Sequence, residues 1–192
     1  MISDLILSIF AFYFYFQHKT LSKRWSMFFL FMGLSAFVGG VYHGFPNIGN
    51  TYRFLSWTFF SGSLIFAQLA SYQDVNDKPI KSIFILKSIL LLFMAIHSLN
   101  FEFIVIDAFV SMFGFIVIGN LLFLKSLSPY ITYGILISFI SAFFLIFKIS
   151  FSPKYMNYND IGHYISILSA IVISKGVRED SIKQLQKIGK TK

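Results

Sequence analysis

Long apolar stretches separated by short polar breaks run along the whole chain. Seven such stretches stand out, and most approach the length of about 20 residues that a helix needs to cross a hydrocarbon core of about 30 Å. The breaks contain Pro, Gly, Asn and Asp, which are typical of turns and loops. The pattern therefore predicts helical membrane spans at about residues 2–17, 25–43, 53–71, 80–99, 101–124, 129–149 and 160–177.

Composition supports a membrane protein. Of the 192 residues, 56% are hydrophobic and 12% are charged, whereas a soluble domain is about one quarter charged. The mean hydropathy is +0.72. These values exclude a disordered chain and a soluble nucleic-acid module, and the absence of cysteine excludes thiolate metal sites. We expect an all-α integral membrane protein with a seven-helix transmembrane domain at residues 1–177 and a basic tail at 178–192.

The distribution of basic residues predicts the orientation. Cytoplasmic loops of membrane proteins are enriched in Lys and Arg. With the N-terminus outside, 13 of the 16 basic residues fall on the inner side, including all of those in the tail. Only three fall outside: Arg53, Lys148 and Lys154. The C-terminus is therefore expected in the cytoplasm. The composition resembles that of bacterial chains, which suggests a bacterial inner membrane.

Ionisable side chains inside membrane spans are costly, so each one is a candidate for function. With the predicted topology, the acidic residues, histidines and one asparagine near the span ends gather in the outer half of the membrane. They are Asp4, His43, His97, Glu102, Asp107, Asn159, Asp160 and His163. We expect a polar pocket there, in which Asn159, Glu102 and His97 accompany the groups with catalytic or metal-binding chemistry.

Two histidines in this set suggest a metal site. His43 ends the second span and His163 begins the seventh, so the two lie at similar depth and meet if those spans are neighbours. Neutral imidazoles on facing helices hold zinc in many proteins. Asp107 or Asp160 is expected to complete the ligand set or to act as the general base. The alternative for each histidine is a residue that only makes hydrogen bonds near a helix end.

The segment Tyr42-His43-Gly44 and the segment from Asn159 to His163, within seven spans, resemble a known superfamily. It comprises the alkaline ceramidases, the progestin/adipoQ receptors and the Per1-like proteins, and the chain is most similar to an uncharacterised bacterial branch. In that superfamily a Ser-x3-His in span two, an Asp in span three and a His-x3-His in span seven form a zinc site. The resemblance implies zinc at His43 and His163 and hydrolysis of lipid amides. This chain departs from the superfamily pattern at three places. Gly39 stands in place of the serine, and Asn159 stands in place of the first histidine of span seven. In addition, residues 51–60 contain no Asp.

Three functions follow from these residues. The first is a metal-dependent hydrolase that acts on a membrane lipid or lipid-like amide or ester. The second is a seven-helix receptor or ligand-binding protein that uses the same pocket without catalysis. The third is a small proton-coupled carrier with Asp107 and Glu102 as proton sites. Membrane lipids are the expected partners, and nucleic acid is not.

Overall fold

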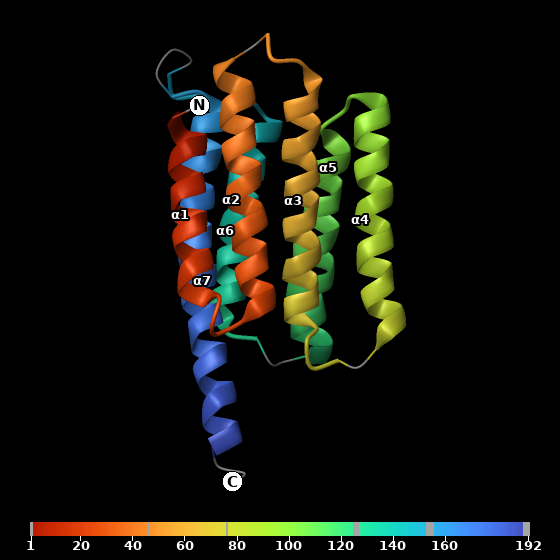
Figure 1. The fold of residues 1–192 in the computed structure, drawn as a ribbon, viewed down its shortest axis with the longest axis vertical. Helices are drawn as coiled ribbons and strands as arrows, with labels where there is room; N and C mark the ends of the chain where they lie inside the picture. Colours follow the sequence, from red (N-terminus) through yellow and green to blue (C-terminus); the bar gives the residue numbers. More distant parts are fainter. Residues whose placement is uncertain (1, 46, 76, 125–126, 153–155, 190–192) are drawn as a thin grey trace.

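The chain folds into a bundle of helices that run along one common direction (Figure 1). The computed structural model describes residues 2–45, 47–75, 77–124, 127–152 and 156–189. Within these ranges the regular elements are helices and no strand, which confirms the predicted all-α class. They are α1 (Ile2–His18), α2 (Lys23–Gly44), α3 (Asn50–Ser71), α4 (Lys78–Ser98), α5 (Glu102–Ala108), η1 (Phe109–Ile118), η2 (Asn120–Leu124), α6 (Pro129–Ile146) and α7 (Tyr158–Gly189).

Five helices are long and apolar enough to cross a membrane: α2, α3, α4, Glu102–Leu122 and α6. Large apolar side chains on α4 are exposed, with Leu86 at 69% and Phe93 at 65%. Such a surface is stable against lipid and unfavourable in water. The protein is therefore an integral membrane protein of the helical class. The count of seven spans and the outside position of the N-terminus stay predictions.

Contacts between helices give the order of the bundle. Helix α1 packs against both α2 and α7, α3 packs against α2 and α4, and α6 packs against α7 and η1. The main core lies between these helices, where Phe29, Leu64, Ile116, Ile135 and Ile173 are almost completely buried. Helices α1 and α7 therefore lie on the opposite side of the bundle from α4 (Figure 1).

Helix α7 continues past the predicted end of its span. It runs from Tyr158 to Gly189 as one helix of 32 residues, so the predicted span and the described part of the basic tail form a single element. Figure 1 shows α7 extending well beyond the ends of the other helices. Residues 190–192 of the predicted tail, and Lys125 and Lys154 of the charge pattern, lie outside the described residues.

The fifth span departs from α-helical geometry. After α5 the backbone adopts the wider π-helical form in η1 and η2, which the apolar pattern does not predict. Tyr72, directly after α3, donates a hydrogen bond to the carbonyl oxygen of Phe115 at 2.8 Å, and a Cβ at Gly119 would collide with the same hydroxyl. The Tyr72 hydroxyl therefore contacts the backbone of the fifth span within its π-helical part.

The start of α6 is tied to the part of α7 that follows the predicted span. Ser128 donates its backbone N–H to Asp180 at 2.9 Å and its hydroxyl to Glu179 at 3.0 Å. Burial raises the pKa of Asp180 above the usual value of 3.8, although the Ser128 bond opposes this shift. Folding thus favours the protonated form of Asp180. The protonated side chain of Asp180 therefore contributes fully to stability below pH 3.8. This contribution is lost as the pH rises through the pKa of Asp180 in the folded protein.

Replacing Asp180 by asparagine is therefore expected to raise the melting temperature at pH 7. Asparagine can still accept the Ser128 N–H bond, but it carries no charge that burial would disfavour. Below the pKa of Asp180 in the unfolded chain, the gain in melting temperature should vanish, because the aspartate is then neutral in the folded and the unfolded state. Thermal unfolding in detergent across this pH range measures the difference. A variant that is less stable than the wild type at pH 7 would contradict the argument.

Candidate functional site

A cluster of polar side chains lies where α1 begins, α2 ends and α7 begins. The Asp4 carboxylate is at its centre and is 2% exposed. Its Oδ1 lies 3.5 Å from Nδ1 of His43 and 3.4 Å from Nε2 of His163. An acidic residue in the first turn of a helix and a basic residue in the last turn both interact favourably with the helix dipole. The helix ends therefore favour Asp4 at the start of α1 and His43 at the end of α2. His163 lies in the second turn of α7, and α1 brings both histidines to one carboxylate.

Two further side chains extend this group, which we call the Asp4 cluster: Ser3, Asp4, His43, Asp160 and His163. The Ser3 hydroxyl donates to Oδ1 of Asp160 at 2.6 Å and lies 3.1 Å from Nδ1 of His163. A hydroxyl has one hydrogen, so Ser3 must accept the second bond from a protonated Nδ1. The chain Asp160–Ser3–His163 thereby fixes which ring nitrogen of His163 carries hydrogen.

This hydrogen assignment leaves an unusual contact at the other ring nitrogen. In neutral His163, Nε2 presents a lone pair, and the Oδ1 atom that it faces belongs to the Asp4 carboxylate. Two acceptors at 3.4 Å repel each other unless a positive charge lies between them. A proton on Nε2, which makes His163 an imidazolium, removes this repulsion and turns the contact into an ion pair with Asp4.

The position of Asp160 follows from the local sequence at the start of α7. The Asn157 side chain accepts the backbone N–H groups of Asn159 at 2.9 Å and Asp160 at 3.1 Å. Asp160 in turn accepts the backbone N–H of Asn157 at 3.2 Å. This reciprocal arrangement is a capping box, in which two side chains satisfy the free N–H groups of a helix start. It holds Asp160 toward Ser3.

Some of the sequence-predicted site residues do not join the Asp4 cluster. Asn159 supplies its backbone N–H to the start of α7. Glu102 accepts a hydrogen bond from Asn100 at 3.1 Å, and His97 stacks on Phe93 with a ring separation of 6.0 Å. Glu102 and His97 belong to α5 and α4, across the bundle from α1 (Figure 1). The residues predicted to form one polar pocket therefore lie in two separate groups at this end of the bundle.

Asp107 forms a second buried cluster, between α4 and the fifth span. Its Oδ1 accepts from Lys87, from Ser88 at 2.9 Å and from Ser111 at 3.1 Å. The side chain of Lys87 thus points into the bundle toward Asp107, and two hydroxyl groups complete the cluster. Among the described residues, Oδ2 of Asp107 is buried without a hydrogen-bond partner.

Sequence reasoning assigned no role to Ser3 or Asp4 within the metal site. It placed Asp4 at the outer end of the first span but did not foresee that α1 lies between α2 and α7. The position of the acidic Asp4 in an otherwise apolar first turn was the one feature of the sequence that could have marked it as a site residue. Over the described parts of the chain, no three His, Cys, Asp or Glu side chains are already gathered around one point as a metal-binding group. The predicted ligands His43 and His163 meet through Asp4.

The fold and this site define a helical integral membrane protein with a polar cluster at one end of the bundle. The chain belongs to the family DUF6962, a family of unknown function, whose pattern matches residues 1–181. No curated protein and no solved structure matches the chain. The likeness to the ceramidase and progestin/adipoQ receptor superfamily therefore stays a prediction from the motifs.

Proposed function

We propose that this protein is a metal-dependent membrane hydrolase that acts on a lipid or lipid-like amide or ester. The observation that supports the proposal is the approach of two histidines to one buried carboxylate, with Oδ1 of Asp4 at 3.5 Å from Nδ1 of His43 and 3.4 Å from Nε2 of His163. Asp4, His43 and His163 are the proposed ligands, and zinc is the ion that the superfamily resemblance implies. Asp4 adds a third ligand to the two that the sequence predicted.

Two distances within the cluster are compatible with such an ion, although no three ligands among the described residues are already arranged around one point. Two donor atoms that each lie about 2.0–2.2 Å from a tetrahedral zinc ion are about 3.3–3.6 Å apart. The two contacts of Asp4 Oδ1, at 3.5 Å and 3.4 Å, fall in this range and are long for hydrogen bonds. Ligating histidines also commonly donate their other ring N–H to a fixed acceptor. For His163 that acceptor is Ser3 Oγ.

Asp160 is the proposed base. When bound, a divalent ion supplies Lewis-acid chemistry, which polarises a carbonyl group and makes water more acidic. Asp160 fixes the orientation of the His163 ring through Ser3. In the proposed reaction its carboxylate also receives a proton from water. Asp107, the other acid considered for this role, pairs with Lys87 in the separate cluster and takes no part in the proposed reaction.

The location of the cluster suits a lipid substrate. It lies at one end of an apolar bundle, and the side chain of His43 is 40% exposed. With the N-terminus outside, as the basic residues predict, the site faces the outer headgroup region of a bacterial inner membrane. A lipid would then present its headgroup linkage to His43 without leaving the bilayer.

Elemental analysis of the detergent-purified protein tests the proposal. We expect about one equivalent of metal in the wild type and loss of it in His43→Ala and His163→Ala. Ser3→Ala is expected to weaken metal affinity about 10- to 100-fold, because it removes the acceptor of the His163 N–H. His97→Ala is the matched control, since this histidine lies across the bundle and should leave the metal content unchanged.

Two results would overturn the proposal in different ways. Absence of metal from the wild type, or full metal in both histidine variants, would remove the metal site. A stoichiometric metal without fatty-acid release from membrane lipids would keep the site but favour the ligand-binding function over hydrolysis.

A further inference from the structure

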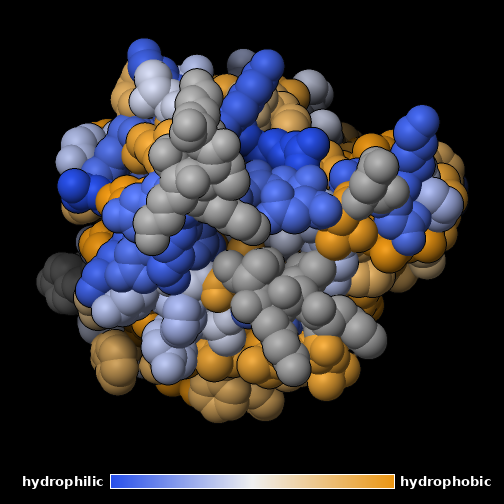
Figure 2. Space-filling model, turned by 90° about the horizontal axis from the view of Figure 1, so that it is seen from below, coloured by the Kyte–Doolittle hydropathy of each residue, from blue (hydrophilic) through white to orange (hydrophobic). Residues whose placement is uncertain are grey.

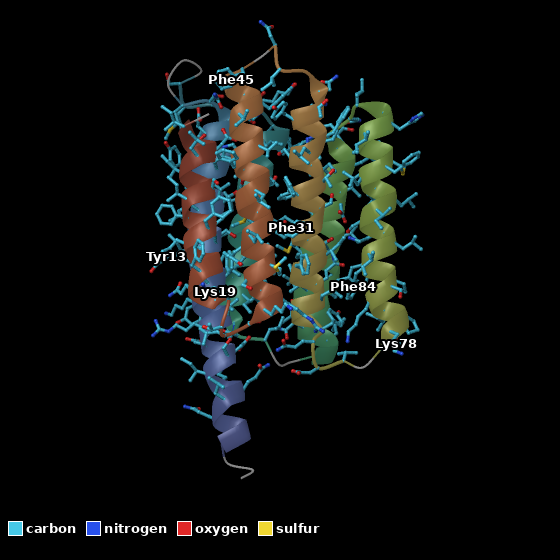
Figure 3. The ribbon with its side chains drawn as sticks, viewed as in Figure 1. Tyr13, Lys19, Phe31, Phe45, Lys78 and Phe84 are labelled. Carbon is cyan, nitrogen blue, oxygen red and sulfur yellow. The ribbon has the colours of Figure 1, made fainter. Side chains whose placement is uncertain are left out.

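A groove of about 240 Å³ runs between α1 and α7, near the end of the bundle opposite to the Asp4 cluster. Its part toward the middle of the bundle is apolar and is lined by Tyr13 of α1 and Ile171 of α7, which are 60% and 42% exposed. Figure 3 shows Tyr13 projecting outward from α1 rather than into the bundle. The groove therefore opens toward the surface that faces lipid.

The other part of the groove is polar. Gln17 and Ser174 line it together with the exposed Lys175 and Arg178, which are three residues apart and share one side of α7. The Ser174 hydroxyl donates to Gln17 Oε1 at 3.4 Å and is 2.7 Å from Nε2 of the buried His18. These contacts join α1 to α7 at the base of the groove, so its shape is fixed by the packing of both helices.

The two cations of the groove lack acidic partners. Neither Lys175 nor Arg178 lies within ion-pair distance of a carboxylate among the residues that the structure describes. The next two residues of α7, Glu179 and Asp180, accept hydrogen bonds from Ser128 at the start of α6. Lys175 also lies over the Tyr130 ring, 3.9 Å from its centroid. Glu179, four residues after Lys175, attracts its charge without forming an ion pair, so the groove keeps two basic side chains beside an apolar wall.

We propose that this groove binds an anionic phospholipid. The headgroup phosphate would lie between Lys175 and Arg178, with Gln17 as a further hydrogen-bond donor, and an acyl chain would follow Tyr13 and Ile171. Basic pockets between helices on the cytoplasmic side suit anionic headgroups, since each cation attracts the negative charge and the apolar stretch takes the chain. Figure 2, a view from this end of the molecule, shows many hydrophilic residues, with hydrophobic residues along part of its edge. The site is independent of the Asp4 cluster.

Native mass spectrometry of the detergent-purified full chain tests the proposal with phosphatidylglycerol, against phosphatidylcholine of the same acyl chains. The wild type should bind phosphatidylglycerol more tightly than phosphatidylcholine. Each cation is expected to contribute about fivefold, so the double variant Lys175→Gln/Arg178→Gln should lose roughly 25-fold in affinity for phosphatidylglycerol. Its affinity for phosphatidylcholine should not change.

The control removes equal charge elsewhere at the same end. Lys78→Gln/Lys81→Gln alters two basic residues at the start of α4, which Figure 3 shows across the bundle from α1. This variant should keep the phosphatidylglycerol affinity of the wild type. An equal loss in both double variants would show attraction to overall charge and would overturn the proposal. Equal binding of the two lipids by the wild type, or competition by millimolar inorganic phosphate without any acyl chain, would overturn it as well.

Discussion

Replacing Asp107 by asparagine is expected to destabilise the protein by about 3–5 kcal/mol. The substitution keeps acceptors for Ser88 and Ser111 but leaves Lys87 charged without its partner. Removing one member of a buried ion pair strands the other charge away from water, and this is more costly than losing the pair. Unfolding in a denaturing detergent, followed by circular dichroism, measures the effect. Lys87→Met should cause a loss of similar size.

The double variant Lys87→Met/Asp107→Asn separates this reason from general damage to the packing. With both charges removed, most of the lost stability should return, which gives a large coupling energy in a double-mutant cycle. Glu102→Gln serves as the control, because this acid lies on the same helix but is bonded to Asn100 near the surface. Additive losses in the double variant would contradict an ion pair as the source of the effect.

Substituting alanine for Gly134 or Gly176 is expected to cost about 1–3 kcal/mol each by overpacking. At Gly134 the added Cβ would lie 2.9 Å from the carbonyl oxygen of Ser169, and at Gly176 it would lie 2.8 Å from the backbone nitrogen of Ile131. Backbone atoms cannot move aside as a flexible side chain can. The two glycines set the close approach of α6 to α7, as small residues do between membrane helices. Thermal unfolding in detergent gives the change in stability.

Gly114 provides the matched control for both glycine variants. A Cβ at this position meets no atom within 4 Å, so Gly114→Ala should leave stability unchanged or slightly improved. If Gly134→Ala and Gly176→Ala behaved like Gly114→Ala, the close approach of α6 to α7 would not depend on the missing side chains.

Much of the fold was predictable because apolar length and turn residues are local signals. The span predicted at residues 25–43 corresponds to Lys23–Gly44, and the one at 53–71 to Asn50–Ser71. The spans predicted at 80–99 and 101–124 leave room only for a tight turn, and the structure has one there, with Leu99 in the left-handed conformation at φ 54°. The end of α7 was less predictable, since the charges that mark the edge of a membrane do not interrupt a helix. The π-helical form of the fifth span has no signal in the apolar pattern, and its contact with Tyr72 comes from a residue far away in the sequence.

The candidate site was predictable only in part, because it depends on the order of the helices. Polarity and depth singled out His43, Asp160 and His163, but a sequence does not state which helix lies between two others. The position of α1 between α2 and α7 makes Asp4 the link between the two histidines. The pairing of Lys87 with Asp107 could have been predicted from the sequence, since the tight turn makes α4 and α5 antiparallel neighbours.

Because α7 is long and uninterrupted, a small tilt of this helix would displace its far end by a large distance. Its 32 residues span about 48 Å, which is about 18 Å more than a hydrocarbon core. His163 lies in the second turn of this helix, and the groove between α1 and α7 lies farther along it. A rigid tilt of about 5° would displace the far end of a 48 Å helix by about 4 Å. If α7 tilts as a rigid body about the end that carries His163, its C-terminal end therefore moves by about the size of a side chain.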